Sequence, residues 1–111
     1  MSIAITVLFR NEADARYDLA YDANTHMPLV QHEWQKYGVT GWSVVKYGPG
    51  PGPDGAEPPF VFGSTVTWAE GSQVQTAFAG PEAARVFADV PNFSNKEPLF
   101  LYGEVVRREG V

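Results

Sequence analysis

The chain has 111 residues, 44% of them hydrophobic and 19% charged, which suits one folded domain with a hydrophobic core and excludes intrinsic disorder. The formal net charge of −5 would be repelled by a phosphate backbone, so we expect no nucleic-acid partner. The sequence has no cysteine, which excludes disulfides, thiol catalysis and thiolate metal sites.

The first residues do not have the pattern of a secretion signal. No basic residue precedes their short apolar run, and Thr6 interrupts it. No segment approaches the roughly 20 apolar residues that a membrane-spanning helix needs. We therefore expect a cytoplasmic protein without a membrane partner.

Residues 3–10 are rich in β-branched and aromatic types and predict a first strand.

A helix is predicted after this strand, with Asp18 as its N-cap because a carboxylate can accept hydrogen bonds from the free amides of a first turn. Apolar and aromatic side chains recur at helical spacing over residues 19–37, and His26 lies on the same stripe. Gly38 and Gly41 mark the end of this helix.

Pro28 lies inside the predicted helix. Proline has no amide hydrogen, and its ring collides with the carbonyl group four residues earlier. We therefore expect a kink near Asn24 and Thr25, with Thr25 capping a second helical segment.

The remaining elements are a strand, a loop, a strand, a broken helix and a last strand, at residues 42–47, 48–59, 60–68, 71–90 and 99–106. Gly80 and Pro81 break the helix. The loop at 48–59 is rich in glycine and proline and longer than two neighbouring strands require, so it is either a flap over a binding site or a stiff surface insertion.

This order of elements predicts an α+β fold of the ferredoxin-like βαββαβ type with a four-stranded antiparallel sheet. Two helices cover only one face of such a sheet. The last strand nevertheless places Leu99 and Leu101 on one face and Phe100 and Tyr102 on the other, so both faces are expected to be apolar. A second copy of the chain is the simplest cover for the free face, which predicts a dimeric α+β barrel.

Three segments resemble the EthD-like proteins of the dimeric α+β barrel superfamily: "YDLAYDANTHMPLV" at 17–30, "GWSVVKYG" at 41–48 and "PLFLYGEVV" at 98–106. The resemblance implies a single EthD-like domain over residues 1–111 that forms a homodimer. It also implies a cleft between sheet and helices for a small apolar or aromatic molecule. Members of the superfamily include oxygenases that need no cofactor, isomerases, decarboxylases and cyclases.

His26 matches the histidine of the family motif and is the candidate general acid or base, because an imidazole exchanges protons near neutral pH. Tyr21 is the candidate partner that orients a substrate or the imidazole. Asn24 is expected either to contact the substrate or to cap the helix kink. The alternative for His26 is a hydrogen-bonded residue at the kink, and for Tyr21 an aromatic ring packed on the sheet.

Aromatic side chains on the strands are expected to enclose the ligand, with Trp42, Trp68 and Tyr102 as the predicted substrate-binding residues. The alternative is that they form core or interface. Glu104 shares a face with Tyr102 and is expected to reach solvent at a sheet edge.

Two apparent motifs fail. Gly50, Gly52 and Gly55 match a dinucleotide-binding pattern, but prolines fill the intervening places and no helix follows. His32 begins a zinc-protease motif that Lys36 breaks. We therefore expect neither a metal nor a nucleotide cofactor.

The leading hypothesis is an enzyme, or an enzyme-like protein, that acts on an apolar or aromatic metabolite in the cleft with His26 as general acid or base. The alternative is a non-catalytic ligand-binding or accessory dimer module. A third hypothesis is a structural dimer whose cleft is filled by its own side chains.

Overall fold

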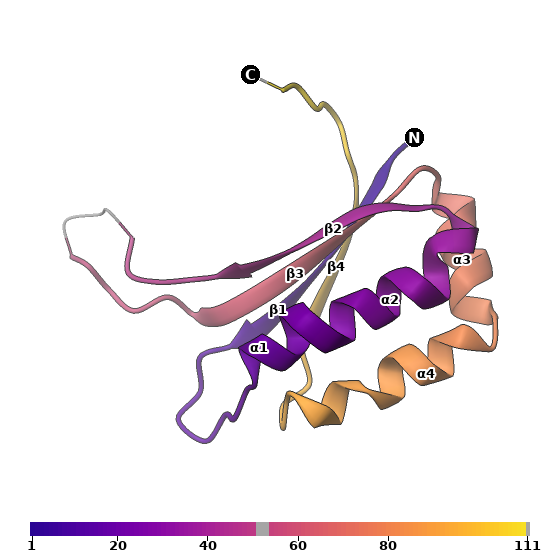
Figure 1. Cartoon of the computed structure of the whole chain (residues 1–111). Coiled ribbons are helices and arrows are strands. Elements are labelled where there is room, and N and C mark those ends of the chain that lie inside the picture. Colours follow the sequence, from indigo (N-terminus) through magenta and orange to yellow (C-terminus); the bar gives the residue numbers. More distant parts are fainter. Residues whose placement is uncertain (51–53, 111) are drawn as a thin grey trace.

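The computed structural model describes residues 1–50 and 54–110, and in it one layer of helices packs on one side of a sheet (Figure 1). The strands are β1 (Ile3–Arg10), β2 (Val39–Lys46), β3 (Phe60–Trp68) and β4 (Leu99–Glu104). The α-helices are α1 (Leu19–Tyr21), α2 (Met27–Trp34), α3 (Gly71–Ala79) and α4 (Glu82–Ala88). A π-helical turn (Asp22–His26) joins α1 to α2, and two 3₁₀ turns (Gln35–Tyr37 and Val90–Asn92) follow α2 and α4.

The sheet has the strand order β2-β3-β1-β4, and every neighbouring pair is antiparallel. Central Ile5 pairs with Val66 on one side and with Tyr102 on the other. This arrangement confirms the predicted α+β ferredoxin-like fold. None of the helices in the described part of the chain is long and apolar enough to span a bilayer.

The strand boundaries follow the sequence prediction closely. The predictions for β1 and β3 are confirmed, whereas β2 begins at Val39, three residues earlier than predicted, and β4 ends at Glu104. A register shift between Val39 and Gly41 absorbs the glycine that was predicted to end the helix. Of the two predicted glycines, Gly38 alone ends the helical segment, and its φ of 112° is a backbone conformation that favours glycine.

The predicted kink at Pro28 was wrong in its form. Asp18 caps the helix as expected, since its carboxylate accepts from the Tyr21 amide at 3.0 Å. Thr25 makes no cap; instead the helix widens into the π turn, in which the Met27 amide donates to the carbonyl of Asp22. Pro28, which has no amide hydrogen to donate, directly follows this widened turn at the start of α2.

The core lies between the sheet and the helices and has two clusters. The larger includes Trp34 and Trp68 together with aliphatic side chains from β1, β3, α2, α3 and α4. The smaller holds Phe9, Phe62 and Phe93, with the rings of Phe9 and Phe62 stacked at 4.3 Å between centroids. Because Phe93 lies on the loop before β4, this cluster fixes that loop to the sheet.

The open face of the sheet is less apolar than predicted. Its middle carries threonines, with a hydrogen bond of 3.0 Å between the hydroxyl groups of Thr6 and Thr65. Apolar residues lie nearer the edges, where Leu101 is half-exposed. The prediction overlooked that β3 alternates, with Ser64 and Val66 facing the helices and threonines facing outward.

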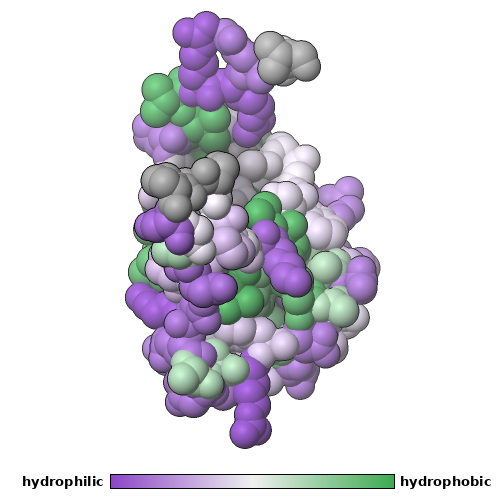
Figure 2. Space-filling view, turned by 90° about the vertical axis from the view of Figure 1, so that its left-hand side faces the viewer, coloured by the Kyte–Doolittle hydropathy of each residue, from purple (hydrophilic) through white to green (hydrophobic). Residues whose placement is uncertain are grey.

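Exposed apolar surface is also visible at one end of the molecule. Figure 2 shows hydrophobic surface on the side of the molecule from which the β2–β3 connection extends, interrupted by hydrophilic side chains. The predicted flap or insertion at 48–59 includes residues 51–53, which lie outside the described residues.

Candidate functional site

A cavity of about 60 Å³ lies between the helices and the sheet, with room for about four to six water molecules. Most of its wall is apolar and comes from both layers: Ile5, Val7, Phe9, Val66 and Trp68 from the strands, and Met27, Val30, Trp34, Phe78 and Val86 from the helices. Its polar side chains are Asp22, His26 and Ser64. A cavity of this composition suits a small, mostly apolar ligand with one or two polar atoms.

His26 is buried in the cavity wall, with 6% of its surface exposed. Its Nδ1 atom lies 2.9 Å from the Oδ2 atom of Asp89, at the end of α4. The ring of Phe93 packs against the imidazole, 4.7 Å away between centroids. The His26 ring is therefore held by one hydrogen bond and one aromatic contact.

Asp89 is the centre of the polar network. Its Oδ1 atom accepts from the Tyr21 hydroxyl at 2.6 Å and from the side-chain amide of Asn92 at 2.9 Å. Burial alone would raise the pKa of Asp89, but the hydrogen bonds from Tyr21, Asn92 and His26 outweigh it and lower that pKa. The hydrogen bond to Asp89 in turn raises the pKa of the Tyr21 hydroxyl, which therefore stays protonated and donates.

This arrangement fixes the chemistry available to His26. An ionised Asp89 only accepts hydrogen bonds, so Nδ1 of an uncharged imidazole must carry the proton and donate it. The other nitrogen, Nε2, then has a free lone pair and can take a proton from a ligand. A carboxylate behind an imidazole also stabilises the imidazolium formed by that transfer.

Asp22 is the second carboxyl group of the site and is 1% exposed. Its Oδ2 atom is buried without a hydrogen-bond partner among the described residues. Burial, and to a smaller extent the charge of Asp89, raises the pKa of Asp22 to about 6. The site therefore holds two carboxyl groups in opposite states, one ionised and one that takes up a proton in mildly acidic solution.

The structure brings together three of the six residues predicted from sequence. Tyr21 and His26 meet at Asp89, and Trp68 lines the cavity. The other three lie elsewhere. The side chain of Trp42 donates to Gln31 at 2.8 Å outside the cavity, Asn24 is exposed, and Tyr102 is 58% exposed on the edge strand.

Sequence reasoning missed Asp89 and Asp22. Asp89 is 63 residues from His26 in the chain, so only the folded structure shows that the two side chains meet. Asp22 lies four residues before His26, a spacing that places both on one side of a helix and was a usable signal.

Three aromatic side chains of the cavity wall also reach the surface of the molecule. Phe78, Phe87 and Phe100 are 38–48% exposed and also line it. A more open groove beside Phe87, Phe100 and Pro98 continues outward to polar residues of the loop before β4, among them Asn95 and Lys96. A ligand longer than the inner cavity can therefore extend a polar end into this groove.

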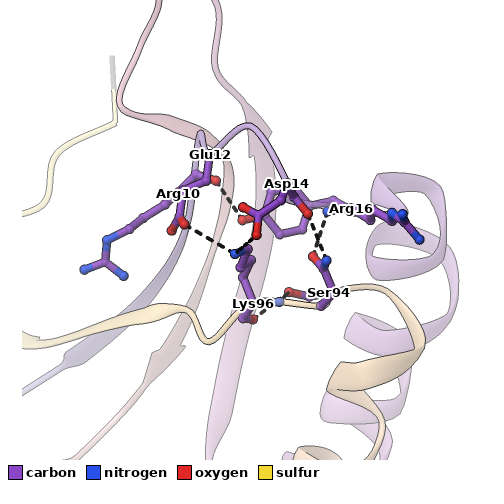
Figure 3. Close-up of polar contacts among 8 residues, drawn as sticks. Arg10, Glu12, Asp14, Arg16, Ser94 and Lys96 are labelled. Atoms are coloured by element: carbon purple, nitrogen blue, oxygen red, sulfur yellow. Dashed lines mark hydrogen bonds and ion pairs between the residues drawn. The ribbon is translucent and has the colours of Figure 1, made fainter.

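The loop before β4 is held by a polar cluster at the end of β1 (Figure 3). The Lys96 ammonium group lies 2.8 Å from the carboxylate of Asp14 and 3.5 Å from that of Glu12. The side chain of Asn95 accepts from the Arg16 amide at 2.7 Å. These contacts fix the loop that carries Phe93 and Pro98 and so help to shape the cavity wall.

Metal-binding groups do not gather in the described residues, where no three histidine or acidic side chains are close enough to share an ion. The described residues of the 48–59 loop do not line the cavity.

Solved structures share this architecture over nearly the whole chain. An EthD-like protein of Ralstonia eutropha JMP134 matches 97% of this chain and 95% of its own with a TM-score of 0.84 at 23% identity. The chain has the fold of the EthD-like proteins. An EthD family protein of Bacillus halodurans C-125 matches with a TM-score of 0.72 at 20% identity, covering 96% of this chain and all of the other.

The EthD-like fold extends to a plant enzyme. A hydroxynitrile lyase of Passiflora edulis matches with a TM-score of 0.66 at 13% identity, covering 98% of this chain and 97% of the other. At these identities the likeness concerns the fold alone. No protein-family model and no curated protein matches the sequence.

The hydrogen bond between His26 and Asp89 makes a testable prediction about the His26 tautomer. We expect ¹⁵N NMR to find the proton of the uncharged His26 ring on Nδ1, because Asp89 accepts it there. Exposed His32 serves as the internal control and should show the usual mixture dominated by the Nε2–H form. Asp89→Asn should abolish the His26 preference, and an Nε2–H tautomer in the wild type would refute the proposed orientation. Spectra are compared where the shifts no longer change with pH.

A second prediction concerns Asp22 and stability. Its pKa rises from 3.8 to about 6 on folding, so stability is lost as the pH rises through this window. Asp22→Asn removes the buried charge and should stabilise the protein at pH 7.5 by on the order of 2–3 kcal/mol, a gain that disappears near pH 4. Urea unfolding followed by tryptophan fluorescence measures both values. Exposed Asp14→Asn is the control and should not show this gain.

Proposed function

We propose that this chain is a small-molecule enzyme of the EthD-like kind that transfers a proton to or from an apolar or aromatic metabolite bound in the cavity. The observation that carries the proposal is the His26–Asp89–Tyr21 hydrogen-bond network, in which His26 lines an apolar cavity and Asp89 and Tyr21 lie behind it. The Nε2 atom of His26 acts as the general base. Asp89 orients the imidazole and stabilises its charged form.

Tyr21 acts on the substrate indirectly in this mechanism. Its hydroxyl hydrogen is engaged by Asp89, so it is a positioning residue that helps keep the carboxylate ionised and aimed at His26. Trp68 and the other aromatic side chains enclose the ligand and exclude water, which strengthens the hydrogen bonds within the site. No metal or nucleotide takes part in the proposed reaction.

The structural likeness favours an enzyme over a non-catalytic structural protein. The same architecture occurs in a hydroxynitrile lyase, and EthD-like proteins share it with TM-scores of 0.84 and 0.72. A single chain already contains the inner cavity, which disfavours the hypothesis of a structural dimer whose cleft is filled by its own side chains. A non-catalytic ligand-binding or accessory module would use the same cavity without converting its ligand.

The proposal includes a homodimer in the cytoplasm. The helices cover one face of the sheet, and the open face exposes Leu101 beside threonines, a mixed surface that a second sheet can cover (Figure 1). In such a pair, the two sheets pack face to face and each subunit keeps its own cavity.

The catalytic role of His26 is tested in two steps. A thermal-shift screen of small apolar and aromatic compounds identifies ligands, and mass spectrometry then detects their conversion. His26→Gln keeps a polar side chain of similar size and should lower turnover at least ~100-fold, because it cannot accept a proton.

The second histidine of the chain provides the matched control. His32→Gln changes an exposed residue outside the cavity and should leave turnover unchanged. Equal turnover in His26→Gln and the wild type would refute the general-base role. Ligand binding without any product would favour the binding module.

The homodimer is tested by light scattering at micromolar concentration. The wild type should have twice the mass of one chain, and Leu101→Lys should dissociate it because the charge is placed on the open face. Val106→Lys is the control, since Val106 is 90% exposed beyond the end of β4. A wild type that stays monomeric contradicts the proposed assembly.

A further inference from the structure

Three residues that line the cavity carry a buried polar side-chain atom for which the described residues provide no hydrogen-bond partner. Among the described residues, the buried side-chain atoms without a hydrogen-bond partner are Asp22 Oδ2, Trp34 Nε1, Trp68 Nε1 and Glu82 Oε2. The first three belong to residues that line the same cavity. A buried polar group without a partner costs stability, and such groups persist where a ligand or water completes them.

Their chemistry restricts what can complete them. An indole N–H only donates, so Trp34 and Trp68 can be satisfied only by an acceptor. The carboxyl group of Asp22 accepts when ionised and donates when protonated. A ligand acceptor therefore suits the indoles in all cases and suits Asp22 in its uncharged form.

The surroundings of Asp22 favour that uncharged form. Among the described residues, no arginine or lysine pairs with Asp22, and the ionised Asp89 repels a second negative charge there. His26 lines the same cavity, but its Nδ1 atom is engaged by Asp89. Burial works in the same direction, because an apolar cavity disfavours a carboxylate.

We propose that Asp22 is a further functional residue of this cavity, whose uncharged carboxyl group donates a hydrogen bond to an acceptor oxygen of an otherwise apolar, uncharged ligand such as a ketone or an aldehyde. This inference rests on the proposed function, because it takes the same cavity as the ligand site. It adds the chemical class of the ligand. The π turn supports it, since the widened turn carries both Asp22 and His26 to the cavity wall.

The inference is tested with three probes of similar size: acetophenone, isopropylbenzene and 1-phenylethylamine. They present a carbonyl oxygen, a methyl group and an ammonium group at the same position of one skeleton. Binding is followed through the indole N–H resonances of Trp34 and Trp68 in NMR titrations. Trp42 is the internal control, because its indole is bonded to Gln31 outside the cavity.

We expect acetophenone to bind at pH 5.5 at least ~10-fold more tightly than the other two probes, since it alone can accept the hydrogen bond. Its affinity should fall as the pH rises to 8, where Asp22 ionises. Asp22→Asn keeps a donor without a charge, so it should preserve the preference and remove this pH dependence. Asp22→Leu should abolish the preference. The same pH dependence in His26→Gln assigns it to Asp22 rather than to the imidazole.

The other outcomes separate the two proposals. Equal binding of acetophenone and isopropylbenzene, unaffected by Asp22→Leu, overturns the inference while leaving the cavity as a ligand site. Preference for 1-phenylethylamine that Asp22→Asn removes overturns it in favour of an ionised Asp22 that binds cations. No shift of the Trp34 and Trp68 resonances with any probe overturns this inference, whereas the proposed function is judged separately by the His26→Gln turnover.

Discussion

The site depends on one partly buried carboxylate, that of Asp89. Asp89 lies at the end of α4. It accepts hydrogen bonds from Tyr21 of α1, from His26 of the π turn and from Asn92 of the 3₁₀ turn that follows α4. An ionised carboxylate among aromatic side chains is costly unless hydrogen bonds replace its water shell. The three donors meet that requirement, so the same contacts that stabilise the packing of the helices also set the tautomer of the imidazole.

The π turn is the local feature that gives this network its shape. Pro28 cannot donate a backbone hydrogen bond, and the chain accommodates it by widening the preceding turn rather than by breaking the helix. As a result Asp22 and His26 are both buried and both line the cavity. A regular capped kink, as predicted at Thr25, would have ended the helix between them.

The apolar wall and the polar network act together. Aromatic contacts of Phe93 with His26 and of Phe9 with Phe62 fix the loop before β4 and the sheet around the cavity, and Lys96 holds the same loop from outside (Figure 3). Within such a wall, water is scarce and each hydrogen bond to a ligand is stronger than in solution. The rings of Phe78, Phe87 and Phe100 line the cavity and are also exposed at the surface.

Local patterns in the sequence determined the strands β1 and β3, the Asp18 cap, the break at Gly80 and the burial of His26, because periodicity and turn chemistry are properties of short segments. The tertiary structure alone decided which polar groups meet. It joined His26 to Asp89 across 63 residues and placed Trp42, Asn24 and Tyr102 outside the cavity. It also left the Oδ2 atom of Asp22 without a hydrogen-bond partner among the described residues. Such contacts depend on how the two helices lie on the sheet, and no single segment of the chain carries that information.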